Sequence, residues 1–215
     1  MYKRQALDKV RNFGDLNEVL VVTNDKFYKD FQKWSETHQE VSFNISVIND
    51  HTKTNEDRLG SIGDIDFTLK EKAINEDVLI MGGDNLFDFN IEEFVNFSKH
   101  KSPHVSIGLY DIKDLNKAEL FGVVVLDEEN RIASFEEKPK RPKSTLIGMC
   151  LYYLPKDSLV FIGQYLSEVK KSDTAGGYIR WLREGYDVYG FQFEGKWYDI
   201  GSIASYQDAQ NSFMN

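Results

Sequence analysis

The chain has 215 residues, and its 26 basic and 35 acidic side chains leave a formal net charge of -9. Such a length suits one large domain or two small ones, which can bury roughly 70% of the unfolded surface without a disulfide or metal. The acidic balance argues against nucleic acid as a main partner, because phosphate backbones are bound by basic faces. A single cysteine, Cys150, excludes an internal disulfide framework and is typical of a reducing compartment.

Neither a membrane span nor a signal peptide is indicated by the sequence. No apolar run approaches the roughly 20 residues that a span requires. The opening residues, Met1 to Asp8, lack the apolar core of a signal peptide. We therefore expect a globular protein of the cytoplasm with no membrane partner.

The first half of the chain alternates strand patterns with helical patterns. The predicted strands are 18–24, 43–48 and 77–81, and the predicted helices are 7–14, 61–73, 91–98 and one capped by Asp25. The first and third strands are nearly continuous apolar runs, which is typical of strands buried on both faces. Strands that alternate with helices predict βαβ units and a largely parallel sheet.

After His104 the pattern changes to strands with little helix between them. The predicted strands are 105–110, 121–126, 131–135, 145–153 and 186–191, and the predicted helices are 174–184 and about 203–213. Asn130 lies in a turn between two of these strands and suits a left-handed backbone conformation. One α/β domain over 1–215, with an antiparallel second half, is the simplest interpretation.

A first candidate site is the segment Met81-Gly-Gly-Asp84-Asn85. It follows a predicted strand, and ligands of open α/β sheets bind at the carboxyl ends of strands. Asp84 could hold Mg²⁺ there, while the glycines would let a substrate approach the backbone. Because Gly, Asp and Asn also favour turns, a simple turn is the alternative interpretation.

Two further acidic segments are candidates. In Glu136-Glu137-Lys138-Pro139, Lys138 could bind a phosphate and Glu137 a sugar hydroxyl. A solvated charge run is the plainer interpretation of that segment. Asp199 precedes a glycine turn and could join Asp84 as a second metal ligand, although alone it would most simply be a turn or capping residue.

The remaining candidates carry weaker signals. Leu59-Gly60-Ser61 opens a predicted helix whose amide groups could face an anion or a base edge, although an ordinary helix start is the simpler interpretation. None of the four histidines has metal-ligand spacing. Cys150 lies in an apolar strand and is interpreted as a core residue, not a nucleophile.

Taken in order, these segments resemble those of the sugar-phosphate nucleotidyltransferase family, in particular its short bacterial glucose-1-phosphate thymidylyltransferase branch. Leu59-Gly60-Ser61 resembles the Leu-Gly-Thr segment near the base, and Gly83-Asp84-Asn85 resembles the Gly-Asp-Asn metal site. Phe121-Gly122-Val-Val resembles Tyr-Gly-Val-Val, a strand that lines the sugar pocket. Glu137-Lys138-Pro139 resembles Glu-Lys-Pro. Trp197-Tyr-Asp199-Ile-Gly-Ser202 resembles Trp-x-Asp-x-Gly-Thr, which carries the second metal aspartate.

The resemblance implies a three-layer Rossmann-like nucleotidyltransferase fold with a mixed central sheet. Its nucleotide-binding part would span about 1–103 and its sugar-binding part about 104–215. The implied reaction joins a sugar 1-phosphate and a nucleoside triphosphate to give a nucleotide-sugar and pyrophosphate. Glucose 1-phosphate and dTTP are the best guess for its substrates. Family members are commonly oligomeric, which allows a homo-oligomer here.

Each residue role follows from the same resemblance. Asp84 and Asp199 would hold Mg²⁺, and Lys138 would be the catalytic residue that neutralises the sugar phosphate. Glu137, Lys138 and the Gly122 backbone would bind the sugar phosphate. The nucleotide would be bound by Leu59, Gly60, Ser61, Gly83 and Asp84.

One departure from the family concerns the start of the chain. The family begins with a strand and a Gly-x-Gly-Thr-Arg loop that wraps the triphosphate, whereas Met1 to Lys9 resemble the helix after that loop. We therefore expect that roughly thirty residues, about one strand–loop–helix unit, are missing, as in a fragment or a wrongly started gene model. Because that strand is central in a doubly wound sheet, its loss would leave unpaired strand edges and an unstable chain. The DNA upstream of Met1 would decide this.

Two other functions are open at this point. The chain could be an inactive homologue that binds a nucleotide-sugar, or acts as a regulatory subunit, without the phosphate loop. It could also be a glycosyltransferase, which shares the α/β architecture and the acidic metal ligands. The Glu-Lys-Pro and Trp-x-Asp-x-Gly segments favour the nucleotidyltransferase over the glycosyltransferase.

Overall fold

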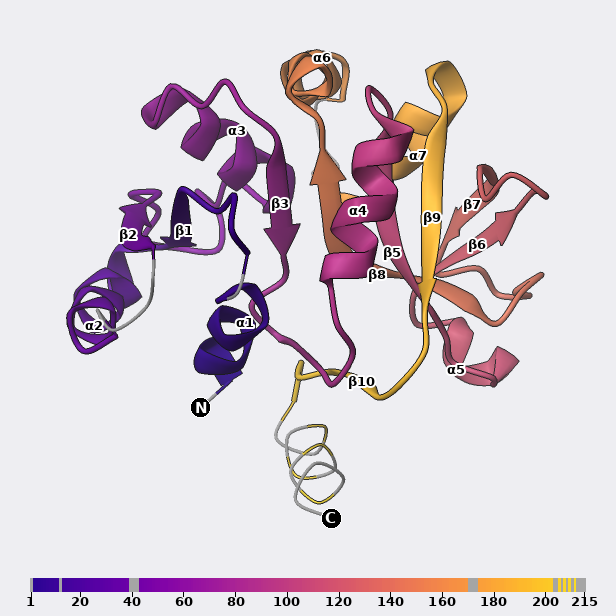
Figure 1. Cartoon of the computed structure of the whole chain (residues 1–215), viewed down its shortest axis with the longest axis horizontal. Coiled ribbons are helices and arrows are strands. Elements are labelled where there is room, and N and C mark those ends of the chain that lie inside the picture. Colours follow the sequence, from indigo (N-terminus) through magenta and orange to yellow (C-terminus); the bar gives the residue numbers. More distant parts are fainter. Residues whose placement is uncertain are drawn as a thin grey trace.

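The strands form one six-stranded sheet and two separate two-stranded pairs, with helices packed around them (Figure 1). The computed structural model describes residues 2–11, 13–38, 43–169 and 174–202, and also 205, 207, 209 and 211. The helices are α1 (Tyr2–Val10), α2 (Asp25–Glu36), α3 (Ser61–Glu71), α4 (Glu92–Lys101), α5 (Leu115–Ala118), the 3₁₀ turn η1 (Lys156–Ser158), α6 (Val160–Glu168) and α7 (Ala175–Gly185). The strands are β1 (Glu18–Thr23), β2 (Asn44–Asn49), β3 (Val78–Met81), β4 (Asn85–Phe87), β5 (Val105–Asp111), β6 (Gly122–Leu126), β7 (Ile132–Glu137), β8 (Leu146–Leu154), β9 (Val188–Phe193) and β10 (Trp197–Asp199).

The six-stranded sheet is organised around β8. One edge of β8 pairs antiparallel with β5, while the other edge pairs with β3 over 151–154 and with β6 at Ile147. β5 pairs parallel with β9, and β6 pairs antiparallel with β7. The predicted α/β fold with a mixed sheet is therefore confirmed. The largely parallel sheet predicted for the first half is wrong, because β3 pairs antiparallel with β8 and not with β1 or β2. Within the described residues, no helix is long and apolar enough to reach across a bilayer.

Helices cover both faces of this sheet and produce three layers. Because successive side chains of a strand point to opposite faces, β8 contributes to two separate apolar clusters. Leu151 and Tyr153 belong to the cluster that contains Phe94 of α4, whereas Leu154 belongs to the cluster that contains Ile179 of α7. All five side chains are buried, so β8 connects the two halves of the core.

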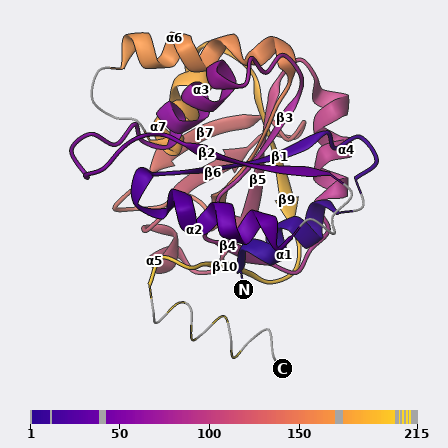
Figure 2. The ribbon, with the colours of Figure 1, turned by 90° about the vertical axis from the view of Figure 1, so that its left-hand side faces the viewer.

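The N-terminal part contains a smaller sheet of its own. β1 pairs parallel with β2, and both lie in front of the larger sheet when the molecule is viewed from that side (Figure 2). The starts of β1 and β3 are close together, since Asn17 Nδ2 donates a 2.7 Å hydrogen bond to Glu76 and Lys72 lies 3.4 Å from Glu18. No strand of the described residues pairs with the second edge of either β1 or β3.

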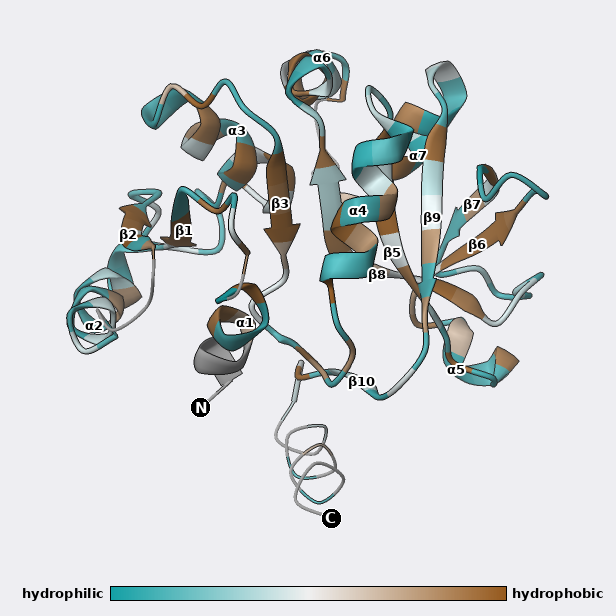
Figure 3. Cartoon of the chain, in the orientation of Figure 1, coloured by the Kyte–Doolittle hydropathy of each residue, from teal (hydrophilic) through white to brown (hydrophobic). Residues whose placement is uncertain are grey.

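This arrangement changes the burial that the sequence predicts. Every residue of β1 and of β3 is only partly buried, so the prediction of two strands buried on both faces is wrong. Figure 3 shows β3 as hydrophobic along its whole length. An apolar run becomes fully buried only where neighbouring strands and helices cover it, and each of these strands is paired along one edge.

Several elements were not predicted from the sequence. α6 begins Val-Phe-Ile, residues that favour strands, yet it is helical and buries Ile162 and Tyr165 in the core. The strands β4 and β10 are only three residues long, too short to give a periodic signal. α2 is capped by Asn24, whose side chain accepts from the Phe27 amide at 3.3 Å, and not by Asp25.

Other local predictions agree with the structure. Asn130 has a φ of 64°, the left-handed conformation expected in the β6–β7 turn. α3 and α7 occupy the predicted helical segments to within two residues at each end. The helix predicted over about 203–213 falls largely outside the described residues.

Candidate active site

One cavity brings together the acidic and basic residues that the sequence singled out. It has a volume of about 220 Å³ and lies where the end of β3, the sheet strands β6 to β8 and the short strand β10 meet. Its lining includes Asp84, Gly122, Glu137, Lys138 and Asp199. Five residues predicted from four separate segments thus share one cavity.

The two aspartates are brought together by the β4–β10 pair. Asp199 is the register partner of Asn85 in this pair, and the Ile200 amide donates to the Asp84 carbonyl at 2.8 Å. Trp197 Nε1 donates to Asn85 Oδ1 at 2.7 Å, and Asn85 Nδ2 donates to Asp84 Oδ1 at 2.9 Å. The chain from Trp197 through Asn85 therefore orients the Asp84 carboxylate.

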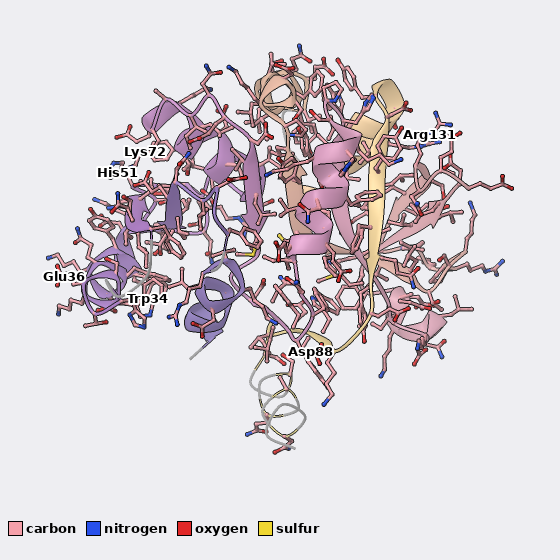
Figure 4. The ribbon with its side chains drawn as sticks, in the orientation of Figure 1. Trp34, Glu36, His51, Lys72, Asp88 and Arg131 are labelled. Carbon is pink, nitrogen blue, oxygen red and sulfur yellow. The ribbon has the colours of Figure 1, made fainter. Side chains whose placement is uncertain are left out.

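The loop before β10 is also held in place. The Asp88 carboxylate accepts from the Lys196 amide at 2.7 Å, and Tyr110 donates to the Gly195 carbonyl at 3.1 Å. Gly195 has a φ of 126°, and a Cβ there would lie 2.4 Å from the Asp88 carboxylate, so only glycine fits. Asp88 lies beside the loop that leads into β10 (Figure 4). A turn was the simplest interpretation of Asp199 alone, but it is the last residue of a strand.

Close packing explains why glycine follows β3. The Gly82 amide donates to the Cys150 carbonyl at 2.7 Å. A Cβ at position 82 would lie 2.5 Å from Asn85 Nδ2 and 2.8 Å from the Cys150 Cβ. A side chain here would push Asn85 and then Asp84 away from β8, so Gly82 sets the depth at which Asp84 enters the cavity.

The charges in the cavity act on one another. Burial raises the pKa of the Asp199 carboxyl above its ordinary value, the negative charge of Asp84 raises it further, and the positive charge of Lys138 opposes both. The charge of Lys138 does not cancel the effect of Asp84 and burial, since the pKa of Asp199 stays raised. A cation bound between the two carboxylates would reduce their repulsion.

The two aspartates fit a magnesium ion that is shared with a substrate. Mg²⁺ is commonly bound by one or two carboxylates together with substrate phosphates and water. In the described part of the chain, no group of three or more His, Cys, Asp and Glu side chains could hold a metal by itself. Asp84 and Asp199 would therefore need oxygens from a ligand to complete the coordination.

Glu137 and Lys138 line the same cavity as this pair. β7 ends at Glu137, which is opposite Gly122 in the β6–β7 register. Lys138 follows with a φ of 44°, and its amide donates to the Phe121 carbonyl at 3.0 Å. The left-handed backbone at Lys138 interrupts the alternation of side chains along the strand, and both Glu137 and Lys138 line the cavity.

Aromatic and apolar side chains form the rest of the wall. Phe121 and Trp197 meet edge to face with their ring centroids 5.5 Å apart, and Phe135 and Ile179 also line the cavity. Sequence reasoning named Phe121 and Trp197 within motifs but missed Phe135 and Ile179. The alternation along β8 could have indicated Tyr152, because Gly148, Cys150 and Tyr152 point to one face and all three line the cavity.

Cys150 is a cavity residue and not purely a core residue as predicted. It is partly buried and lies near both aspartates. Burial raises the pKa of its thiol to about 11, and the charges of Asp84 and Asp199 contribute to that rise. The thiol is therefore protonated at neutral pH, which agrees with the prediction that Cys150 is not a nucleophile.

The remaining predicted residues lie outside this cavity. Gly60 has a φ of 82° and precedes α3, which begins at Ser61. Leu59 is exposed and borders a separate hollow with Phe67 of α3. Gly83 is not part of the cavity lining. The structure thus gathers the residues assigned to metal and sugar phosphate and leaves the proposed base segment apart.

The fold and this cavity define the class of protein. Residues 4–215 match the nucleotidyl transferase family model, so the chain belongs to that family. Over 146 residues it is 30% identical to the glucose-1-phosphate adenylyltransferase of Clostridium acetobutylicum. That match covers 65% of this chain and 37% of the relative, so the chain spans well under half of the curated relative's length.

Two solved structures share the fold at low sequence identity. A Bacillus anthracis protein described as a glucose-1-phosphate thymidylyltransferase, in complex with sucrose, superposes with a TM-score of 0.72 and 22% identity, over 98% of this chain and 81% of that one. Apo UDP-glucose pyrophosphorylase superposes with a TM-score of 0.78 and 18% identity, over 99% of this chain and 86% of that one. At these identities the similarity establishes the architecture alone.

Proposed function

We propose that this protein joins a sugar 1-phosphate to a nucleoside triphosphate and releases pyrophosphate. The observation that carries this proposal is the division of charge within one cavity. Asp84, Asp199 and Lys138 lie where phosphates and a divalent cation would bind, and Glu137 borders glycine and aromatic residues where a sugar would lie. This pattern matches both parts of a sugar phosphate.

The phosphate chemistry requires positioning and charge but no protein nucleophile. A sugar-phosphate oxygen would attack the α-phosphorus in line, forming the new P–O bond as the bond to pyrophosphate breaks. Lys138 would neutralise the attacking phosphate. Asp84 and Asp199 would hold Mg²⁺, which when bound neutralises phosphate charge and orients the phosphates.

The size of the cavity limits what it can enclose. A cavity of about 220 Å³ is below the ~300–1,000 Å³ of sites that enclose a drug-sized ligand, so it suits one monosaccharide and not a whole nucleotide-sugar. The Glu137 carboxylate can accept hydrogen bonds from sugar hydroxyls. The Trp197 and Phe121 rings offer apolar surface to the sugar ring.

Glucose 1-phosphate and dTTP are the first substrates to test. The similar proteins are named after glucose 1-phosphate or glucose nucleotides, but after different bases: adenylyl, thymidylyl and uridylyl. Glucose is therefore better supported than thymidine. The choice of base needs measurement.

The test is pyrophosphate release by the 215-residue chain. We expect Mg²⁺-dependent release with one of the four common nucleoside triphosphates and glucose 1-phosphate, with mannose 1-phosphate as the competing sugar. Asp84→Asn and Asp199→Asn should each reduce the rate at least about a hundredfold, while the exposed Asp30→Asn on α2 should not. Calorimetry that shows nucleotide-sugar binding without turnover would instead support the inactive homologue. An absence of both would overturn the proposal.

A further inference from the structure

The first turn of α7 forms part of the cavity wall at Glu137. α7 begins after Thr174, whose side chain accepts from the Gly177 amide at 3.0 Å. Gly176 lies in this first turn and lines the cavity. A Cβ built on Gly176 would lie 2.0 Å from Glu137 Oε2 and 2.9 Å from Glu137 Cδ. The Glu137 carboxylate thus occupies the space that any side chain at position 176 would need.

A second glycine borders the same oxygen from the sheet. A Cβ built on Gly122 of β6 would lie 3.2 Å from Glu137 Oε2 and 2.5 Å from the Phe135 ring. Gly122 and Gly176 therefore flank one carboxylate, although one belongs to β6 and the other to α7. Among the described residues, the Glu137 carboxylate forms no hydrogen bond and no ion pair. Its position is therefore fixed by the shape of its surroundings and not by a polar partner.

We infer that Gly176 is a positioning residue of the sugar subsite. Its missing side chain lets Glu137 rest against the first turn of α7, where a carboxylate is also favoured by the helix dipole. The carboxylate then points into the cavity at one defined depth. This inference rests on the proposed function, because the groups that Glu137 would meet there are the hydroxyls of the sugar.

A positioning role differs from a structural role in its effect on stability. Within a helix, alanine is more favourable than glycine for the free energy of folding. The atoms that a new methyl group would displace are the end of a flexible side chain and, at 3.3 Å, the Phe135 ring. Gly176→Ala should therefore leave the melting temperature unchanged or raise it, while it moves the carboxylate.

The kinetic test compares Gly176→Ala with the wild type. We expect the KM for the sugar 1-phosphate to rise about tenfold, because one hydrogen bond to a charged group would be lost. The KM for the nucleoside triphosphate should change less than about twofold. Gly163→Ala on α6 is the matched control, because a Cβ there meets nothing within 4 Å. Equal sugar-phosphate KM values for all three proteins would overturn the inference.

A double-mutant cycle tests whether Gly176 acts through Glu137. In a Glu137→Ala background there is no carboxylate to displace, so Gly176→Ala should cause no further rise in the sugar-phosphate KM. A full tenfold effect in that background would assign Gly176 a role of its own and overturn the inference.

A structural test does not depend on turnover. The crystal structure of Gly176→Ala should show the Glu137 carboxylate moved away from α7, whereas an unmoved carboxylate would overturn the inference. If the wild type turns over no sugar 1-phosphate but the carboxylate still moves, the proposed function fails and the positioning role of Gly176 stands.

Discussion

β1 and β5 have similar apolar sequences but very different burial. Residues 105–109 of β5 are all buried, whereas β1 contains no fully buried residue. β5 pairs with β8 along one edge and β9 along the other, while β1 pairs with β2 alone. This difference shows that the burial of a strand depends on how many of its edges are paired and how many layers cover it. An apolar sequence is required for burial but does not produce it alone.

The cavity lies in the region of the large sheet, which contains β5. Strands β6, β7 and β8 and helix α7 form part of its wall, and all of them belong to the large sheet or pack on it. The Leu59-Gly60-Ser61 segment leads into α3, away from this cavity. A large part of the candidate site is therefore built on elements of the large sheet. Figure 4 shows the two ends of the molecule: Arg131 on the β6–β7 hairpin, and Lys72 and His51 on the N-terminal part.

The largest effect that should follow from this contrast is in amide hydrogen exchange. A two-stranded sheet is marginal by itself, so amides of β1 and β2 should exchange through local opening that leaves the large sheet intact. We expect central amides of β5 and β8 to exchange at least about a thousandfold more slowly than those of β1 and β2. Equal protection in the two sheets would show that they unfold as one unit and would break the comparison.

Core truncation should show the same difference in equilibrium stability. Leu109 of β5 is fully buried, so Leu109→Ala should reduce the free energy of unfolding by about 3 kcal/mol, from lost apolar contact and the cavity left behind. Val21→Ala in the half-buried β1 should reduce it by about 1 kcal/mol. Chemical denaturation of both variants measures the two losses. Similar values would mean that β1 is more enclosed than its exposure indicates.

These regions also show how far sequence could lead. Asp84, Glu137, Lys138 and Asp199 were predicted because each lies in a short local motif. Their gathering depends on β4 pairing with β10, strands joined by a hydrogen bond that spans 112 positions, and no local pattern reports such a contact. The position of Gly176 against Glu137 was missed for the same reason. The overestimated burial of β1 and β3 arose because a strand's own sequence does not reveal how many partners it has.

A third prediction concerns the acidic pair in the cavity. Since the folded pKa of Asp199 is raised, its contribution to stability is greatest below the unfolded pKa and is lost as pH rises through the folded pKa. At pH 7 without metal, the ionised carboxylate is a net cost, reduced by its solvent exposure. Asp199→Asn should therefore raise the melting temperature in chelator by up to about 2 °C.

The control for this prediction lies in the less buried region. Asp30→Asn on the exposed face of α2 should leave the melting temperature unchanged in chelator. With Mg²⁺ and a nucleoside triphosphate present, the order should reverse, because only the wild type and Asp30→Asn keep both proposed metal ligands. A lower melting temperature for Asp199→Asn in chelator would contradict the predicted repulsion between Asp84 and Asp199.

The smallest effect compares two loop aspartates, one in each region. Hydrogen bonds from the Arg131 amide and guanidinium lower the pKa of Asp127, and hydrogen bonds from the Thr54 and Lys53 amides lower that of Asp57. A lowered carboxyl pKa contributes stability above the unfolded pKa, and this is lost as pH falls through the folded pKa. Asp127→Asn should therefore lower the melting temperature slightly at pH 7, and the difference should be lost as pH falls through the folded pKa of Asp127.

Asp57→Asn is the partner in this test, because its hydrogen bonds stabilise a loop before α3 and not a hairpin of the large sheet. If the N-terminal part opens separately, losing the Asp57 contacts should speed amide exchange near β1 and α3 while the global melting temperature hardly changes. If both substitutions lower the melting temperature equally at pH 7, the two regions unfold together, and the unequal burial of β1 and β5 reflects local packing within one cooperative unit.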